Sequence, residues 1–515
     1  MERNILLLYM PAADQKMLPF PPLGISVLSG YLRRAGITAN IDDLEIKYWD
    51  RDIIELKFLK ILLRKLPLLK YNNPKKIFLD KEKIGEYLDK NIRHEKIEKV
   101  LAEWESLLDI SINKVGYVGF SIMGLSQLIT SLCFAKYLKR RYGVKIVFGG
   151  SFIAKRMAIL VEKYNFVDYL IIGEGEIPLF RLLSGHSENE IDNLVFKRGQ
   201  QVTINSINSV YPDNMEPDFE GLPFMLYRKN NILLMPYETS RGCRNKCAFC
   251  ITRRKNLYIK KPEVIIQEIK KIKERHKASC FIFIDNAINI DRDFSAELCA
   301  KIIQNKLNIV WSAYYIPEDA DEAYFRLLKS AGCIQLRWGI EMLGERVLKE
   351  MNKKINETAV SKALNKSHRA GIWNHLIFMV GHPGENWSDI FHLVSFINRN
   401  KKYFRSALVT PLDIGRVDIL DDAENHYEDL CTSDNSEDKG MLGIKYWELK
   451  YRRYGLRADL IKFLLKSIGI RYLSNFIERK EHFEKYQFIY RAFAGHIKNF
   501  GRTLNCSEES LPCAE

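Results

Sequence analysis

Three cysteines within eight residues are the strongest candidates for chemistry in this chain of 515 residues. Cys243, Cys247 and Cys250 have the spacing C-x3-C-x2-C in the stretch SRGCRNKCAFC, and Phe249 precedes the last of them. Such thiols could hold a zinc ion, form a redox pair, close a disulfide or bind an iron–sulfur cluster. A structural zinc site takes four protein ligands, usually as two separated pairs. A redox pair of Cys247 and Cys250 would leave Cys243 without a role.

A cubane iron–sulfur cluster also takes four ligands, most often thiolates. Three cysteines would leave one iron open to a ligand that does not come from the protein, as a catalytic metal site requires. The loop also follows an expected strand at 232–238, on the side where barrels of parallel strands carry their chemistry. The pattern therefore favours a cluster with an open iron, and structural zinc remains the alternative.

Apolar segments that alternate with amphipathic helices from residue 231 onward are expected to position this loop. Six segments are expected to be strands, namely 232–238, 280–285, 308–313, 334–341, 375–381 and 406–411. Strands and helices in this order predict a parallel sheet, and six βα units predict a partial (β/α)6 barrel over 231–411. Residues 412–515 are expected to be mostly helical and to close the barrel.

The first 185 residues show the same alternation and predict a separate α/β domain with a doubly wound, Rossmann-like sheet. Its expected strands are 4–9, 37–43, 115–121, 144–150 and 167–176. The strands end in small or polar segments such as GFSIMG, FGGS and GEGE, and ligands of such sheets lie beyond these ends. A Lys- and Leu-rich insertion at 51–110 is expected to be a helical lid or cap, and 186–230 a linker with short strands.

Composition places the chain among globular proteins, with 47% hydrophobic and 28% charged residues. The net charge of +15 would suit nucleic acid, but the basic residues are interleaved with acidic ones on expected helices, which is typical of solvated faces. We therefore do not expect nucleic acid as a partner. The first residues lack the features of a signal peptide, and no apolar run reaches the length of a membrane span, so a cytoplasmic protein is expected. Ten cysteines in such a protein favour free thiols or metal ligation over disulfides.

The cysteine stretch resembles the signature of the radical S-adenosylmethionine (SAM) enzymes. The C-x3-C-x2-C spacing, the aromatic Phe249 before the last cysteine and the preceding TSRG at 239–242 match the pattern of that family. The resemblance implies that Cys243, Cys247 and Cys250 hold a [4Fe-4S] cluster whose open iron is chelated by the amino and carboxylate groups of SAM. It also implies an external electron donor of the flavodoxin or ferredoxin type, and cleavage of SAM into methionine and a 5′-deoxyadenosyl radical.

Three further segments resemble the strands that surround SAM in this family. They are FIFIDNAIN (281–289), RWGIE (337–341) and FMVGHPGE (378–385). The resemblance implies contacts with the polar atoms of SAM from the first segment, with the ribose from the second and near the adenine from the third. Carboxylates at such positions could accept hydrogen bonds from an ammonium group or from ribose hydroxyls. The implied cofactor-binding residues are Phe249, Asp285, Asn286, Asn289, Glu341 and Gly381.

A doubly wound domain ahead of such a barrel resembles the cobalamin-binding subclass of the family. FPPLGISVLSGYLRRAGI (20–37) resembles its PPLG segment, and the glycine-containing strand ends resemble the loops that receive cobalamin. One departure is the missing D-x-H-x-x-G motif, since His94 is the only histidine before residue 186. No histidine of this motif can therefore ligate cobalt, and a domain that has lost cobalamin remains an alternative. The implied cobalamin-binding residues are Leu23, Gly24, Ser121, Gly149, Gly150, Gly173, Glu174 and Gly175.

The resemblance implies a cobalamin-dependent radical SAM methyltransferase. Such an enzyme methylates an unactivated carbon of a natural product, a peptide or a cofactor intermediate through a 5′-deoxyadenosyl radical and methylcobalamin. This chemistry demands no general acid or base, so none is nominated. The alternatives are a cobalamin-binding radical SAM enzyme that oxidises, cyclises or rearranges its substrate, and a non-catalytic protein that binds metal or nucleic acid. A methylthiotransferase acting on tRNA is disfavoured, because residues 1–132 contain no cysteine for a second cluster.

Overall fold

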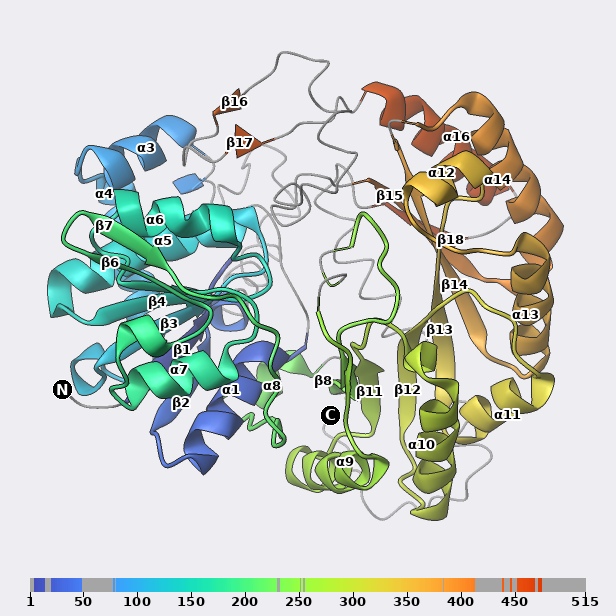
Figure 1. The fold of residues 1–515 in the computed structure, drawn as a ribbon, viewed down its shortest axis with the longest axis horizontal. Helices are drawn as coiled ribbons and strands as arrows, with labels where there is room; N and C mark the ends of the chain where they lie inside the picture. Colours follow the sequence, from blue (N-terminus) through green and yellow to red (C-terminus); the bar gives the residue numbers. More distant parts are fainter. Residues whose placement is uncertain are drawn as a thin grey trace, which may run out of the picture.

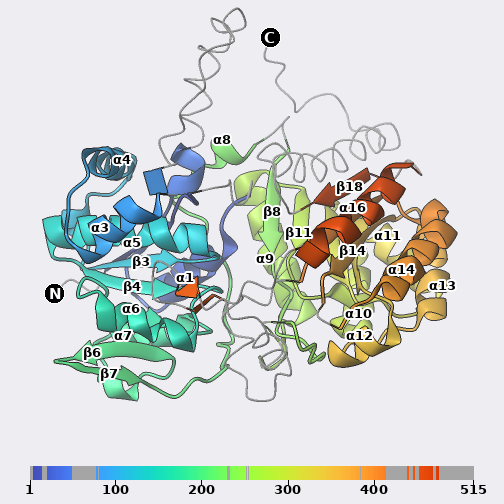
Figure 2. The same cartoon turned by 90° about the horizontal axis from the view of Figure 1, so that it is seen from above.

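Two seven-stranded sheets lie side by side and divide the molecule into a first half, up to residue 228, and a second half, from residue 232 (Figures 1 and 2). Helices flank each sheet. No described helix is long and apolar enough to cross a membrane. The computed structural model describes residues 4–13, 20–48, 77–78, 80–228, 232–250, 252, 255–382, 384–412, 438–439, 445–446, 452–467 and 471–474.

The first half is built on a sheet with the strand order β2-β1-β3-β4-β5-β6-β7. The strands are β1 (Ile5–Tyr9), β2 (Ala39–Asp43), β3 (Tyr117–Ser121), β4 (Lys145–Gly149), β5 (Tyr169–Ile171), β6 (Leu194–Arg198) and β7 (Gln201–Ile204). The first five pair in parallel, which confirms the doubly wound sheet. The hairpin of β6 and β7 pairs antiparallel with β5, so the short strands expected in the 186–230 linker are present but belong to the sheet. The reason is that Leu194, Val195 and Phe196 are buried, which a solvated linker does not allow.

Both faces of this first sheet are covered. In β1, Ile5, Leu7 and Tyr9 pack into one hydrophobic core, whereas Leu6 and Leu8 pack into another. Every residue of β1 is buried, as expected for a parallel strand covered on two sides, and this explains its continuous apolar run. The helices of this half are α1 (Leu23–Arg34), α3 (Lys81–Asp89), α4 (Glu95–Ser106), α5 (Leu125–Tyr142), α6 (Ile159–Lys163) and α7 (Glu176–Leu183).

Helices α3 and α4 are the described helices of the insertion at 51–110 and confirm that this part is helical. They do not form a lid, because their apolar side chains are buried against α5 in a core of the first half. Trp104 of α4 is fully buried and stacks on Phe78, with ring centroids 5.1 Å apart. Residues 51–76 of the insertion lie outside the described residues.

The chain between the two halves is tied to the first half. Arg33 of α1 forms an ion pair with Asp218 at 2.7 Å, and the buried Tyr227 hydroxyl donates a hydrogen bond to Asp43 at 2.6 Å. These contacts fix where the chain enters the second half. The shorter elements of the molecule are α8 (Phe224–Tyr227), β9 (Ser240–Arg241), β10 (Tyr258–Ile259), β16 (Asp438–Lys439) and β17 (Lys445–Tyr446).

The second half is built on a sheet with the strand order β18-β15-β14-β13-β12-β11-β8. The strands are β8 (Leu234–Tyr237), β11 (Cys280–Phe283), β12 (Val310–Tyr315), β13 (Cys333–Glu341), β14 (Trp373–Val380), β15 (Ser406–Pro411) and β18 (Arg471–Ser474). All six neighbouring pairs are parallel, which confirms the partial barrel. The seventh strand, β18, lies in 412–515, where the sequence predicted mostly helix. Its four residues are too few to show a strand period.

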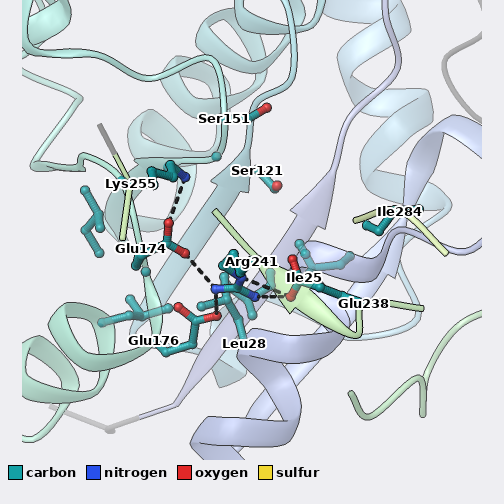
Figure 3. A pocket seen from close by; sticks show the side chains of 18 of the residues that line it. Ile25, Leu28, Ser121, Ser151, Glu174, Glu176, Glu238, Arg241, Lys255 and Ile284 are labelled. Atoms are coloured by element: carbon teal, nitrogen blue, oxygen red, sulfur yellow. Dashed lines mark hydrogen bonds and ion pairs between the residues drawn. The ribbon is translucent and has the colours of Figure 1, made fainter. Parts of the chain in front are cut away.

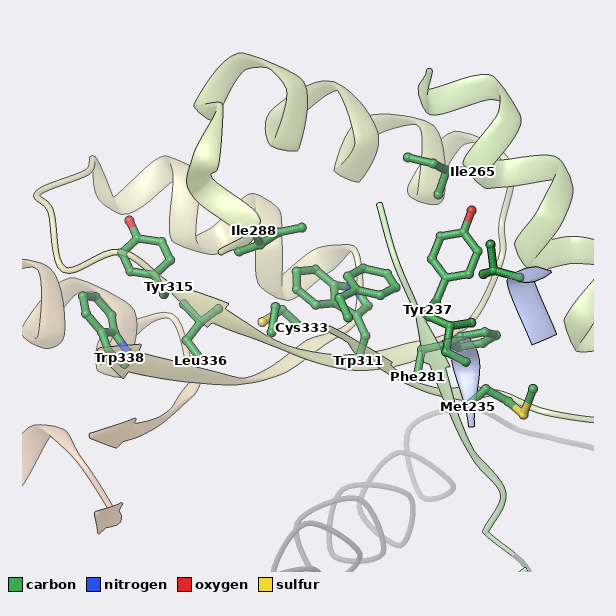
Figure 4. Close-up of a cluster of buried hydrophobic side chains, with 14 of the residues drawn as sticks. Met235, Tyr237, Ile265, Phe281, Ile288, Trp311, Tyr315, Cys333, Leu336 and Trp338 are labelled. Carbon is green, nitrogen blue, oxygen red and sulfur yellow. The ribbon is translucent and has the colours of Figure 1, made fainter. Parts of the chain in front are cut away.

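Large aromatic side chains join this second sheet to the helices outside it (Figure 4). Trp311, Tyr315 and Trp338 are buried on the outer face, and the rings of Tyr315 and Trp338 lie 4.4 Å apart. Side chains alternate along a strand, so their neighbours Tyr314 and Arg337 face the inside of the barrel. The helices of this half are α9 (Pro262–His276), α10 (Arg292–Gln304), α11 (Glu322–Ser330), α12 (Glu345–Glu350), α13 (Glu357–Arg369), α14 (Trp387–Asn400) and α16 (Arg452–Ser467).

Candidate cofactor-binding site

A cavity of about 300 Å³ lies between the carboxyl ends of the two sets of strands. The first half contributes the start of α1 and the loops after β3, β4 and β5, and the second half contributes residues that follow β8 and β11 (Figure 3). The structure therefore brings most residues implied for cobalamin, and two of those implied for SAM, to one place. The predicted residues that line the cavity are Gly24, Ser121, Gly149, Gly150, Gly173, Glu174, Gly175, Asp285 and Asn286.

The strand ends of the first half leave this space because they carry little side-chain bulk. A Cβ atom on Gly24 would lie 3.9 Å from Oγ of Ser121, and one on Gly150 would lie 2.5 Å from the backbone oxygen of Ile122. Gly150 also has a φ of +104°, so the turn after β4 needs a glycine. Leu23 differs from the other implied residues, because its side chain is buried in the core beside the cavity.

The cysteine loop, residues 242–250, follows the short strand β9, which pairs antiparallel with β10. Gly242 opens the loop with a φ of +85°, and a Cβ atom there would lie 2.1 Å from the backbone oxygen of Asn256. Only glycine fits so close to a neighbouring backbone. Cys247 is buried, and Cys243 and Cys250 are partly exposed. The fold thus presents three free thiols on one short loop at the carboxyl end of β8.

Three thiols on one short loop suit a cubane iron–sulfur cluster, because each thiolate binds its own iron. Burial raises the pKa of the Cys247 thiol to about 11, and Lys353 opposes that rise. A bound metal would hold such a thiol as the thiolate.

Asp285, just after β11, orders the start of the cysteine loop with one carboxylate oxygen. Its Oδ1 accepts hydrogen bonds from the backbone N–H and the hydroxyl of Thr239, at 2.8 and 2.9 Å, and from the same two groups of Ser240. Its Oδ2 is buried without a hydrogen-bond partner in the described part of the chain. Burial raises the pKa of Asp285 to about 6, and Glu238 adds to the rise. One oxygen therefore holds the loop, while the other remains available to a ligand.

Glu341, the last residue of β13, occupies a strained position near the cysteine loop. Its φ is +63°, and the register between β13 and β14 shifts between Gly339 and Glu341. Its Oε1 lies 3.0 Å from Nζ of Lys353, and its Oε2 is buried with no partner among the described residues. The same Nζ lies 5.7 Å from the ring centroid of Phe249, beside Cys250. Strain next to a half-satisfied carboxylate is typical of a functional site.

Three other residues implied for SAM have their polar groups engaged within the protein. Asn286 lines the cavity, but its amide donates to the backbone of the cysteine loop at 2.6 Å. Asn289 is fully buried, and its side chain bonds the backbone N–H and carbonyl of Ile316 at 2.8 and 3.1 Å. The N–H of Gly381 donates to Glu385 at 2.9 Å. Asn289 and Gly381 therefore support the strand ends and do not line the cavity.

Arg241 joins the two halves at the cavity, although no sequence pattern singled it out (Figure 3). Its guanidinium forms ion pairs with three carboxylates, those of Glu174 at 2.6 Å and Glu176 at 2.8 Å in the first half and that of Glu238 at 2.8 Å in the second half. Lys255 pairs with Glu174 at 2.7 Å. Burial alone would lower the pKa of Arg241, but the three carboxylates outweigh it and raise that pKa well above its ordinary value. The arginine lies within SRGC, yet only the folded contact reveals its role.

Arg337 is a second cation that the sequence did not single out. Its guanidinium lies 4.0 Å from the ring centroid of Tyr314, inside the barrel. Its Nε is buried without a partner in the described part of the chain, and Nη2 makes only a long hydrogen bond of 3.4 Å to the carbonyl of Phe283. A cation with an unpaired buried nitrogen favours an anionic ligand in that space.

Residues 237–397 match the family model of the radical SAM superfamily. The match begins at the last residue of β8 and contains the cysteine loop, Asp285 and Glu341. It continues through β11, β12, β13 and β14 into α14, so it rests on the barrel as well as on the cysteine spacing. Residues 237–397 are a radical SAM domain.

Two curated relatives are similar over part of their length. An uncharacterized methyltransferase of Pyrococcus horikoshii is 22% identical over 279 residues, which are 52% of this chain and 61% of that protein. An anaerobic magnesium-protoporphyrin IX monomethyl ester cyclase of Cereibacter sphaeroides is 21% identical over 375 residues, 63% of this chain and 60% of that protein. The chain thus spans about three fifths of the length of these relatives.

A solved structure resembles the molecule over both halves. It is TsrM, a radical S-adenosylmethionine methyltransferase from Kitasatospora setae, with cobalamin and a [4Fe-4S] cluster bound. The TM-score is 0.57 at 15% identity, and the match covers 80% of this chain and 75% of that one. The doubly wound sheet followed by a partial barrel is therefore a fold shared with a radical SAM methyltransferase whose structure contains cobalamin.

Replacing Asp285 by asparagine separates the two roles of its carboxylate. Asn keeps an oxygen for Thr239 and Ser240 but removes the group whose pKa is raised to about 6. Because the raised pKa favours protonation of the folded state, wild-type stability falls as pH rises from about 4 to about 6. The free energy of unfolding of Asp285→Asn minus that of wild type should therefore be about 1–3 kcal/mol larger at pH 7 than at pH 4. Urea unfolding at several pH values measures this.

Asp293→Asn is the matched control, because Asp293 is exposed on α10, away from the cysteine loop. Its unfolding free energy should keep the wild-type pH dependence. An Asp285→Asn variant with the wild-type pH dependence would contradict the buried, half-paired carboxylate described above.

Proposed function

We propose that this chain is a cobalamin-dependent radical SAM enzyme that methylates an unactivated carbon. The observation that carries the proposal is the cavity of about 300 Å³, whose wall combines the glycine-rich strand ends of the first half with strand ends of the radical SAM domain. A reaction that uses two cofactors needs both of them at one site. The fold shared with TsrM, whose structure contains cobalamin and a [4Fe-4S] cluster, supports the same proposal.

In this proposal the residues of the second half hold the cluster and SAM. Cys243, Cys247 and Cys250 bind the cluster through their thiolates, with Phe249 packed beside them. Oδ2 of Asp285 and Oε2 of Glu341 accept hydrogen bonds from SAM, since both atoms are buried without a described partner. When bound, the cluster and SAM supply an organic radical, and cobalamin supplies the methyl group. Asn286, Asn289 and Gly381 keep the strand ends in place around SAM.

The residues of the first half form the cobalamin side of the cavity. Their small side chains allow a flat, bulky cofactor to approach the backbone closely. Leu23 supports this wall from the core. His94 lies at the start of α4 and is not proposed as a cobalt ligand. The proposed residues are Gly24, Ser121, Gly149, Gly150, Gly173, Glu174 and Gly175.

The substrate is proposed to be a small molecule or peptide that carries a carboxylate or a phosphate. Arg337 supports this class, because its buried Nε has no described partner and it lies inside the barrel. The net charge of +15 favours the approach of such a substrate. An external donor of the flavodoxin or ferredoxin type is proposed to supply the electron.

A radical reaction without methyl transfer is the second candidate. The similarity to an anaerobic magnesium-protoporphyrin IX monomethyl ester cyclase favours it. SAM with a deuterated methyl group separates the two candidates. Transfer of the label to protein-bound corrin supports the methyltransferase. Corrin that stays unlabelled while methionine accumulates supports the second candidate.

Anaerobic reconstitution with iron and sulfide tests the proposed cluster. We expect about four irons per chain, and release of methionine from SAM when the protein is reduced with dithionite. Cys247→Ala should lose both, because two thiolates do not hold a cubane stably. Cys299→Ala is the matched control, since Cys299 is buried on α10 and outside the cysteine loop. A wild-type chain that binds zinc but no iron would contradict the proposal.

Filling the cavity from the first half tests the proposed cobalamin site. Gly149→Leu should reduce hydroxocobalamin binding at least about tenfold, because the new side chain takes up space at the cavity wall. Its Cβ would lie 3.8 Å from the carbonyl of Ile171, an ordinary contact, so the fold should tolerate the change. Gly85→Leu is the control, since Gly85 lies on α3 with no atom near its Cβ position. Corrin absorbance after gel filtration gives the stoichiometry, and equal binding by both variants would refute this site.

A further inference from the structure

Lys353 connects the cysteine loop with Glu341, and nothing in the sequence patterns assigned it a role. Its Nζ lies 3.0 Å from Oε1 of Glu341 and 5.7 Å from the ring centroid of Phe249. The side chains of Lys353 and Glu341 are only 12% and 10% exposed. An ammonium group so shielded from solvent interacts strongly with nearby charges. A cluster on the three cysteines would place a further negative charge near this ammonium group.

The turn that carries Lys353 is docked on the backbone of the cysteine loop. The N–H of Ala248 donates to the carbonyl of Met351 at 2.9 Å, and the amide of Asn352 donates to the carbonyl of Lys246 at 2.8 Å. Asn352 adopts a φ of +49°, a left-handed conformation that Asn tolerates better than most residues. Lys353 then closes the end of α12 through its own N–H. Residues 351–353 therefore fix the ammonium group relative to the loop.

The ion pair with Lys353 also determines which carboxylate oxygen of Glu341 is available to a ligand. Because Lys353 binds Oε1, the oxygen left without a described partner is Oε2. A Cβ atom on Gly339 would lie 2.9 Å from Oε1 of Glu341 and 3.4 Å from Nζ of Lys353, so the pair packs directly on the bulged strand. The absence of a side chain at Gly339 makes room for it. Lys353 thus holds a carboxylate whose backbone is itself strained.

We propose that Lys353 is a positioning residue that fixes Glu341 and raises the reduction potential of the cluster bound by the cysteine loop. The proposal rests on the proposed cluster. Reduction takes one electron from an external donor and converts [4Fe-4S]2+ into [4Fe-4S]1+, which adds one negative charge to a group that already carries three thiolates. A fixed ammonium group close to the loop stabilises the added charge, whereas the carboxylate of Glu341 opposes it.

A potentiometric titration of the reconstituted protein, followed by electron paramagnetic resonance, tests this role. Lys353→Met should lower the equilibrium constant for one-electron reduction about tenfold, which is 59 mV. Lys353→Arg should retain most of the wild-type potential, because it keeps the charge. Glu341→Gln should shift the potential upward, and the double variant Lys353→Met/Glu341→Gln should lie between the two single variants. Lys354→Met, at the exposed neighbour, is the matched control and should leave the potential unchanged.

Iron content separates this proposal from the one on which it rests. If wild type binds no cluster, the proposed function fails and the role of Lys353 fails with it. If wild type and Lys353→Met both hold about four irons but share one potential, only the role of Lys353 is overturned. If Lys353→Met does not assemble the cluster, the reduction potentials of the Glu341→Gln and Lys353→Arg variants still test the proposal. The proposal is overturned if the reduction potential does not rise in Glu341→Gln. It is also overturned if the potential of Lys353→Arg falls by about 59 mV, the fall expected when the charge is lost.

Discussion

Arg241 fixes the relation between the two halves of the molecule, and the site depends on that relation. It lies two residues before Cys243, on the strand that opens the cysteine loop, and its guanidinium bonds Glu174 and Glu176 of the first half. Both carboxylates are buried, so these ion pairs are screened little by salt. Removing one partner from such a network leaves uncompensated buried charge, at a cost of about 3–5 kcal/mol. The cysteine loop is therefore held against the loop that follows β5, across the cavity.

Two carboxylates at strand ends each use one oxygen to bind the protein and leave the other oxygen available to a ligand. Asp285 binds Thr239 and Ser240 through one oxygen, and Glu341 binds Lys353 through one oxygen. The second oxygen of each is buried without a described partner. Because the first oxygen is already held, the second occupies its position before any ligand arrives. Such preorganisation lowers the cost of binding a cofactor in a defined orientation.

The features that could be predicted from the sequence are those that depend on residues close together in the chain. The apolar run of β1 predicted a strand because parallel strands covered on both faces bury every residue, as the structure shows. The spacing of Cys243, Cys247 and Cys250 is equally local and indicated a cluster before any fold was known. The glycine-rich strand ends were recognised for the same reason, since a parallel sheet brings its carboxyl ends to one edge.

The features that the sequence did not predict depend on contacts between distant residues. Arg241 bonds Glu174, 67 positions away, and Asn352 bonds Lys246, 106 positions away. No periodicity carries such information. Asn289 was implied as a cofactor-binding residue, but its amide binds the backbone of Ile316. The sequence alone does not tell whether an amide at a strand end faces a ligand or a neighbouring loop. Short strands were expected within 186–230, but not that β6 and β7 extend the first sheet, and β18 was missed because four residues give too little pattern.

An iron left open for SAM at the three cysteines is the central claim. Electron paramagnetic resonance of the reduced, reconstituted protein with and without SAM tests it most directly. If the amino and carboxylate groups of SAM bind the open iron, the g values of the [4Fe-4S]1+ signal change when SAM is added. The same signal at every SAM concentration would contradict an open iron and, with it, the radical chemistry proposed for this chain.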